Sequence, residues 1–173
     1  MRTSLLLSAA LVVALAAPLA ADARAEAKSQ VAFGISVAEK GLWHEAAIHW
    51  EQATKLDPRY AEAWNNLGVA YSKAGQSAKA IEATQQALRI NPEHAKAWYN
   101  LGNAYADAGQ SAKAIEAYQQ ALRINPEYAG AWYNLGVVYS QSGQRGKVLE
   151  VYKRLKTLDP ARAERFFKGA VMR

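Results

Sequence analysis

Three histidines are the residues whose ordinary chemistry includes metal binding and proton transfer near neutral pH. His44 and His49 are five positions apart, so they do not share a helical face, and His94 stands alone. The sequence has no Cys, and none of its His, Asp and Glu residues has metal-ligand spacing. It also has no nucleophile elbow, phosphate-cradling Gly-rich loop or pair of catalytic carboxylates. We therefore predict that the protein is not an enzyme and carries no metal or cofactor.

Amides and aromatic rings at a regular spacing are better candidates for function. Asn66, Asn100 and Asn134 recur every 34 residues, and Tyr99 and Tyr133 precede the last two. An Asn amide both donates and accepts, so this series could hold an extended peptide backbone, or it could serve hydrogen bonds within the fold. The sequence leaves both interpretations open.

The net charge of +6 is concentrated at the C-terminal end. From Gly143 onward there are nine Lys and Arg residues and three Asp and Glu residues, so the rest of the chain is balanced. A basic face can meet an acidic partner, an anionic lipid or nucleic acid, or can simply be a solvated surface. Because the aromatic residues recur at a spacing typical of a core, we predict no nucleic-acid partner.

Residues 1–25 have the features of a secretory signal peptide. Met1-Arg2 is a positive start, Leu5 to Ala17 is an uncharged apolar run, and small residues fit cleavage after Ala23 or Ala25. The alternative is a retained anchor, but a spanning helix needs ~20 apolar residues and Pro18 interrupts this run. We expect cleavage, a periplasmic or secreted mature chain and no stable membrane insertion.

The remainder repeats one pattern four times. Residues 75–93 and 109–127 differ at one position only, Thr84 against Tyr118. The offset of 34 divides residues 26–173 into repeats 27–60, 61–94, 95–128 and 129–162, with a capping helix over 161–173. Within the second repeat, apolar and small residues at positions 64, 67, 68 and 71 share one helical face, which predicts helices over 61–74 and 77–90. The sequence contains no alternating strand pattern, so the fold class is all-α.

The series Trp64, Leu67, Gly68 and Tyr71, followed by Ala80 and Ala87 and closed by Pro92, resembles the tetratricopeptide repeat. The match extends over nearly all of residues 26–173. It implies a right-handed α-solenoid in which stacked repeats bury a continuous core. The first repeat departs most, with Gln30 for Trp, Phe33 for Leu and Val37 for Tyr, as in a diverged terminal repeat.

The resemblance also implies a partner-binding groove along the first helix of each repeat. Candidate groove residues are Asn65, Asn66, Lys96, Tyr99, Asn100, Asn103, Tyr133 and Asn134. One sub-family binds C-terminal carboxylates through a clamp of basic and Asn residues, but only Asn66 and Lys96 match it here. That clamp is therefore not expected.

Two functions follow. The first is an interaction module that holds a peptide or partner protein in the groove, with the partner unidentified. The alternative is a self-associating scaffold of the cell envelope, for which an exposed Phe166-Phe167 pair near the C-terminus would offer an apolar contact.

Overall fold

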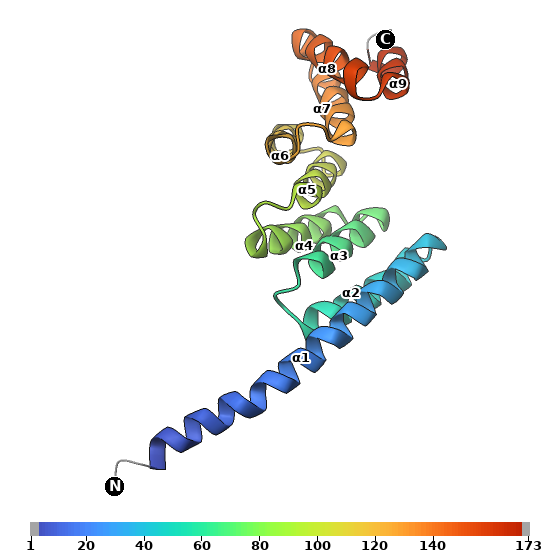
Figure 1. Cartoon of the computed structure of the whole chain (residues 1–173). Helices are drawn as coiled ribbons and strands as arrows, with labels where there is room; N and C mark the ends of the chain where they lie inside the picture. Colours follow the sequence, from blue (N-terminus) through green and yellow to red (C-terminus); the bar gives the residue numbers. More distant parts are fainter. Residues whose placement is uncertain (1–3, 171–173) are drawn as a thin grey trace.

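The computed structural model describes residues 4–170, and it describes the side chains of residues 21–169. Within these residues the chain forms nine helices and no strand (Figure 1), which confirms the all-α prediction. The final positions of the expected capping helix, 171–173, lie outside the described residues. The helices are α1 (Ser4–Glu39), α2 (Trp43–Leu56), α3 (Ala61–Lys73), α4 (Ser77–Ile90), α5 (Ala95–Asp107), α6 (Ser111–Ile124), α7 (Ala129–Gln141), α8 (Arg145–Leu158) and α9 (Pro160–Ala170).

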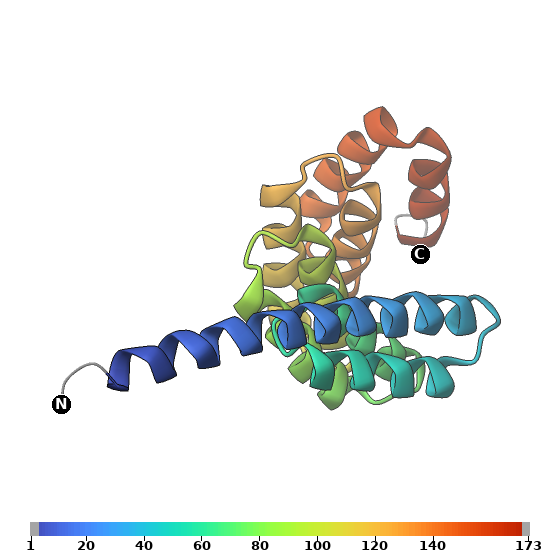
Figure 2. The ribbon, with the colours of Figure 1, turned by 60° about the horizontal axis from the view of Figure 1, so that its bottom comes forward.

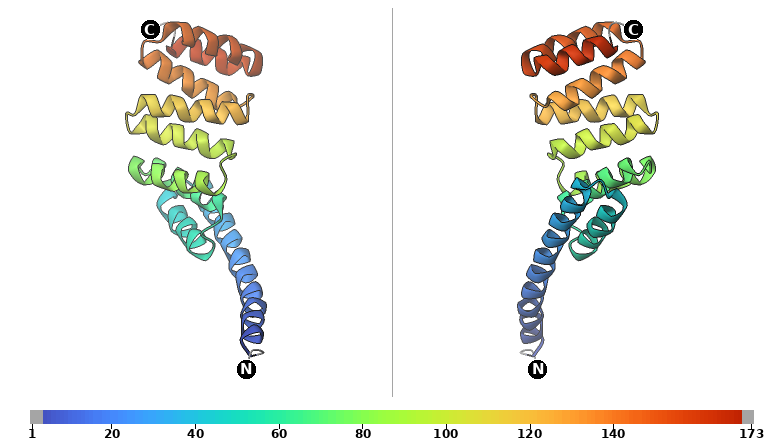
Figure 3. Two further views of the ribbon diagram at one scale, coloured as in Figure 1. Left: turned by 90° about the vertical axis from the view of Figure 1, so that its left-hand side faces the viewer. Right: turned by 90° about the vertical axis from the view of Figure 1, so that its right-hand side faces the viewer.

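Each repeat is a helical hairpin, and the hairpins stack as a right-handed solenoid. The pairs are α1 with α2, α3 with α4, α5 with α6 and α7 with α8, and each pair also packs on the next. Figure 3 shows the helices α2 to α8 lying one above another along the stack, and Figure 2 shows the same stack turned toward its N-terminal end. The first part of α1 projects beyond the stack in all views.

Glycine ends the first helix of every repeat. Gly41, Gly75, Gly109 and Gly143 all have positive φ, between 71° and 79°, a conformation in which a Cβ would be strained. The sequence predicts a helix over 61–74, and the positive φ of Gly75 confirms that the helix ends there.

The sequence places Asn or Asp before Pro at positions 57, 91, 125 and 159, which predicts that each of these residues caps the next helix. The first three of these turns differ from the prediction. Asn91 Oδ1 accepts a hydrogen bond from the Glu93 backbone N–H at 3.2 Å, and α5 begins only at Ala95. The Trp98 indole then donates to the Pro92 carbonyl at 2.8 Å and fixes this turn to the helix. Only Asp159 behaves as expected, because it accepts from the Arg162 backbone N–H at 2.9 Å and Pro160 begins α9.

The core depends on close approach between the two helices of a repeat. A Cβ built on Gly102 would lie 2.5 Å from Cε1 of Tyr118, so only glycine lets this ring lie against α5. Leu101 packs on the preceding repeat through Ala87 and Leu88. The same contacts recur along the stack and make its core continuous.

Phe33 departs from the position predicted for it. It occupies the leucine position of the repeat, which is buried at Leu67 and Leu101, yet Phe33 is 53% exposed. In the later repeats this position packs on the second helix of the repeat before it, and no helix of the described chain precedes α1. The diverged first repeat therefore leaves an aromatic ring at the end of the stack.

The C-terminal phenylalanines correct another expectation. Phe166 is 1% exposed, and its ring lies over Gly136 and against Val151. Phe167 is only partly exposed and packs on the Tyr152 ring, with centroids 5.1 Å apart. The two rings cover the last repeat, so they do not form the exposed apolar contact proposed for self-association.

Among residues 21–169, whose side chains the structure describes, no helix combines the length and the apolar character required to cross a membrane.

Candidate partner-binding groove

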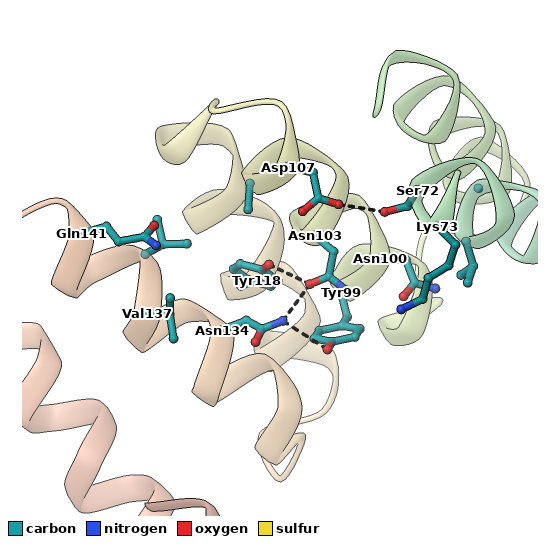
Figure 4. Close-up of a pocket in the computed structure, with 14 residues that line it drawn as sticks. Ser72, Lys73, Tyr99, Asn100, Asn103, Asp107, Tyr118, Asn134, Val137 and Gln141 are labelled. Carbon is teal, nitrogen blue, oxygen red and sulfur yellow. Dashed lines mark hydrogen bonds between the residues drawn. The ribbon is translucent and has the colours of Figure 1, made fainter. Parts of the chain in front are cut away.

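The first helices of successive repeats form one wall of a concave groove. A pocket of about 590 Å³ runs along α3, α5 and α7. Figure 4 shows the side chains that line it. They are Gly68, Val69, Ser72, Lys73, Tyr99, Asn100, Asn103, Ala106, Asp107, Tyr118, Asn134, Val137, Val138 and Gln141.

An amide and phenol network occupies the centre of this pocket. The Asn134 side-chain N–H donates to the Tyr99 hydroxyl at 3.2 Å and to Asn103 Oδ1 at 2.8 Å. The Tyr118 hydroxyl donates to the same Asn103 oxygen at 2.7 Å. Figure 4 shows these bonds converging between α5 and α7. They join two neighbouring repeats and hold the groove side chains in fixed orientations.

Contrary to the prediction, the Asn65 side chain does not face the groove. It is 1% exposed, and its Oδ1 accepts from the Asn100 side-chain N–H at 2.8 Å. Its own N–H group donates to Asn66 Oδ1 at 3.4 Å. A buried amide must be hydrogen-bonded to avoid a large desolvation cost, and Asn65 meets this requirement by linking α3 to α5. The buried Asn65 side chain therefore holds the Asn100 side chain in place.

The remaining amides retain one free group each. Within the described residues, no hydrogen bond engages the Nδ2 of Asn66 or Asn103, or the Oδ1 of Asn100 or Asn134. The two interpretations of the Asn series are therefore compatible. One end of an amide bonds within the fold, and the other end is available to a ligand.

Asn66, Lys96 and Tyr133, which were predicted to face the groove, do not line this pocket. Lys96 is exposed and is not among the lining residues. Tyr133 instead lines a smaller neighbouring pocket of about 270 Å³, which shares Tyr99 and Asn134 with the first.

Several lining residues were missed by sequence reasoning. The Ser72 hydroxyl of the second repeat donates a hydrogen bond to Asp107 Oδ2 of the third repeat at 2.8 Å. Tyr118 was assigned to the core, and its ring is indeed buried, but its hydroxyl reaches the groove. Burial raises the pKa of this hydroxyl above its ordinary range, so it remains a neutral donor at physiological pH. The amphipathic character of Tyr is the signal that could have identified it.

In the region covered by the structure, no group of three or more His, Cys, Asp or Glu side chains is arranged to hold a metal ion.

The family assignment follows from matches along the whole solenoid. Tetratricopeptide repeat models match residues 61–94, 83–116 and 129–162, and a TPR repeat model matches 37–75 and 102–143. The chain belongs to the tetratricopeptide repeat family. TPR domains are protein–protein interaction modules, and this chain has the helical hairpins and concave groove of that class.

Solved structures agree with the TPR assignment. The crystal structure of MamA is similar with a TM-score of 0.73 and 29% identity, covering 80% of this chain and 81% of that one. TTC0263, a thermophilic TPR protein of Thermus thermophilus, has a TM-score of 0.72 and 21% identity, with 84% of each chain covered. The second likeness shows the fold alone.

Curated relatives match only short segments of this TPR chain. Superkiller protein 3 of Schizosaccharomyces pombe is 34% identical over 41 residues, which are 24% of this chain and 3% of that protein. The chloroplastic TPR protein PYG7 of Arabidopsis thaliana is 38% identical over 52 residues, which are 30% of this chain and 17% of that protein. This chain thus spans a small part of either relative.

Proposed function

We propose that this protein is an interaction module that holds an extended peptide segment of a partner protein in its concave groove. The observation that carries the proposal is the set of free amide groups in a pocket of about 590 Å³. Of the amides that line this pocket, Asn103 offers a donor, and Asn100 and Asn134 offer acceptors. Exposed peptide backbone needs both kinds of partner.

Preorganisation supports this role. Each free amide group belongs to a side chain whose other end is hydrogen-bonded within the fold, so little rotamer entropy is lost when a peptide binds. Val69 and Val137 border the amides and offer apolar contact for alternate peptide side chains.

Site-specific photo-crosslinking in the producing cell tests the proposal. A benzophenone amino acid replaces Val69 or Val137 in the groove, and the exposed Glu82 on α4 provides the outer-face control. We expect adducts with a protein partner from the two groove positions only, because Glu82 does not line the pocket. Equal adduct formation from both faces, or adducts from the outer face alone, would contradict the groove proposal. Helicity measured by circular dichroism checks that each variant folds.

Self-association is the second candidate function, and Phe33 is the observation that favours it. Its ring is 53% exposed at the end of the stack and packs edge-on against the His49 ring, with centroids 4.5 Å apart. Light scattering over a micromolar concentration range tests this candidate. A mass that rises with concentration, and that returns to the monomer value with Phe33→Gln, would support a scaffold, whereas a constant monomer mass would exclude one.

We further propose that the mature chain begins at Arg24 and acts in the periplasm or outside the cell. The apolar segment before Ala23 supports export, and the contacts of Arg24 support cleavage after Ala23 rather than after Ala25. Arg24 forms an ion pair with Asp57, and its guanidinium lies 4.6 Å from the centre of the Tyr60 ring. Cleavage after Ala25 would remove these contacts. N-terminal sequencing of the exported protein tests this, and a first residue of Glu26 would contradict it.

A further inference from the structure

Helix α9 turns toward the groove at the C-terminal end of the stack. It packs against both helices of the last repeat, α7 and α8. Phe166 lies over Gly136, which is the place that Tyr118 takes over Gly102 one repeat earlier. The Tyr133 ring packs edge-on against Phe166, with centroids 5.8 Å apart. The position of α9 is therefore fixed by a buried ring.

This position brings two cations to the end of the groove. The pocket of about 270 Å³ is lined by Tyr99, Gly130, Tyr133, Asn134, Arg162 and Arg165, and none of these residues is acidic. Tyr99 and Asn134 also line the main pocket, so the basic pocket continues the groove.

The two arginines have spare hydrogen-bonding capacity. Arg162 uses its Nε in a 3.4 Å ion pair with Asp159, while its Nη1 lies 3.7 Å from the place of a Cβ on Gly130. Arg165 is exposed and has no ion pair or hydrogen bond within the described residues. The hydroxyls of Tyr99 and Tyr133 likewise donate to no acceptor there.

Gly130 lies in the wall of this pocket. The corresponding positions of the second and third repeats hold the long charged side chains Glu62 and Lys96. In the fourth repeat the Tyr128 ring and the Arg162 guanidinium approach this position, because a Cβ on Gly130 would lie 3.2 Å from Tyr128 Cε2 and 3.7 Å from Arg162 Nη1. The pocket thus combines four donors with a glycine that lets Arg162 come close to α7, and it borders the same groove that offers amide groups to a peptide.

We propose that the Arg162–Arg165 pocket binds a carboxylate of an acidic peptide segment lying in the groove. The proposal rests on the proposed function and specifies the partner's chemistry. Guanidinium groups match carboxylates in charge and in planar geometry, and the two phenols can complete the anion's hydrogen bonds. The concave location favours a peptide over a lipid surface, because a flat membrane would meet only the exposed side of Arg165. An acidic side chain and a C-terminal carboxylate share this chemistry, and the experiment separates them.

Affinity selection from a random nonapeptide library on the full chain is the test. Selected peptides are identified by mass spectrometry, then remade with Asp and Glu changed to Asn and Gln, and separately with an amidated C-terminus. We expect acidic residues to be enriched and Arg165→Gln to weaken binding about tenfold, the usual scale for losing one charge-assisted hydrogen bond. Loss of binding on amidation alone would show that the pocket takes a C-terminal carboxylate. Loss of binding on Glu→Gln would show that it takes an acidic side chain.

The controls separate this proposal from the proposed function. Arg165→Gln is preferred to Arg162→Gln because Arg165 has no hydrogen-bond or ion-pair partner among residues 21–169, and Lys153→Gln with Lys156→Gln removes charge from the exposed face of α8. Equal losses in both variants would overturn the pocket and leave only general electrostatics. If Val137→Glu weakens peptide binding and Arg165→Gln does not, the result would overturn the pocket proposal and support the groove proposal. If instead the protein binds no peptide but binds vesicles of anionic phospholipid, and that binding is lost in Arg165→Gln, the result would overturn both the pocket proposal and the groove proposal.

Discussion

At position 84 a threonine stands where the other repeats have Trp50, Tyr118 and Tyr152. The Thr84 methyl group reaches the point over Gly68 that the Tyr118 ring reaches over Gly102, and the Thr84 hydroxyl donates back to the Ala80 carbonyl at 2.7 Å. With the smaller side chain over it, Gly68 lines the groove pocket although it is buried, whereas Gly102 does not line that pocket. One residue therefore changes the wall of the groove at the second repeat.

The first prediction concerns this position. Thr84→Tyr should raise the free energy of unfolding by roughly 1 kcal/mol, because an aromatic ring over Gly68 buries apolar surface that is now open to the groove. Urea unfolding measures the change. Adding Val69→Asn supplies the new hydroxyl with the acceptor that Asn103 gives Tyr118. A lower stability in both variants would show that the neighbouring side chains have already closed the space.

Ionisation of the Tyr71 hydroxyl should lower the stability of the folded state at alkaline pH. Burial, and next its 2.6 Å hydrogen bond to Glu51, raises the pKa of Tyr71 from 10.0 to about 12. The folded state therefore holds this proton to a higher pH than the unfolded chain does. Its contribution is complete below pH 10 and is lost as the pH rises toward 12.

Urea unfolding at pH 9 and pH 11 checks this second prediction. The wild-type chain should lose more stability over that interval than Tyr71→Phe, which has no hydroxyl to ionise. Tyr105→Phe is the matched control, because the Tyr105 hydroxyl accepts from the neutral amide of Gln85 at 3.0 Å. The pKa assignment fails if Tyr71→Phe follows the wild-type chain across the interval.

Helix α9 is the element that makes the last repeat differ from the others. Asp159 caps its N-terminus, and Phe166 supplies the ring that the second helix supplies elsewhere. Tyr152 is consequently displaced onto Phe167, and its hydroxyl makes a 3.4 Å contact with Glu164. The element thus caps the core and, through Arg162 and Arg165, shapes the end of the groove.

The third prediction tests the docking of this helix. Phe166→Ala should lower the free energy of unfolding by about 3 kcal/mol, because it removes a ring that is 1% exposed and leaves a cavity above Gly136. Hydrogen exchange should increase mainly in residues 160–170. Phe167→Ala, at a partly exposed ring, provides the control and should cost about 1 kcal/mol. Similar costs for the two variants would mean that α9 is not held by Phe166.

On the scale of the whole molecule, the middle repeats present equivalent surfaces to their neighbours. The second repeat packs on the first through Ala63, Leu67, Ala70 and Ala83. The third repeat has the same residue types at Ala97, Leu101, Ala104 and Ala117. In a solenoid whose repeats contact only their neighbours, stability is close to a sum over repeats and interfaces.

The fourth prediction follows from this equivalence. Deleting residues 61–94 joins Tyr60 to Ala95 and should leave a folded three-repeat solenoid with unchanged helicity per residue and a lower melting temperature. Circular dichroism and thermal unfolding measure both. Deleting residues 160–173 removes fewer residues but exposes Val151 and Gly136, so we expect it to broaden the transition. A cooperative transition in the second variant alone would contradict the nearest-neighbour description.

Much of the architecture could be predicted because it depends on local pattern. The 34-residue period, the helical spacing of Trp64, Leu67 and Tyr71, and the glycine helix ends are written directly in the chain, and the helices follow them. The error at Asn91 is also local in origin. The sequence shows a capping residue, but not that α5 begins three residues beyond Pro92.

The groove could be predicted only in part. The helical face of Asn100, Asn103 and Asn134 was apparent, but the burial of Asn65 was not, because its depth depends on the neighbouring α5 supplying a hydrogen bond. The groove role of the Tyr118 hydroxyl was missed for a similar reason, since that group belongs to a buried ring on a second helix.

The properties of the groove therefore divide into those that the sequence determined and those that the tertiary structure decided. The sequence by itself determined that amides recur at 34-residue intervals, because residue type and spacing are properties of the chain. Only the tertiary structure decided which end of each amide is free and where α9 carries Arg162 and Arg165. Hydrogen-bond partners and the position of a terminal helix depend on side chains that are distant in sequence and meet only when the repeats stack.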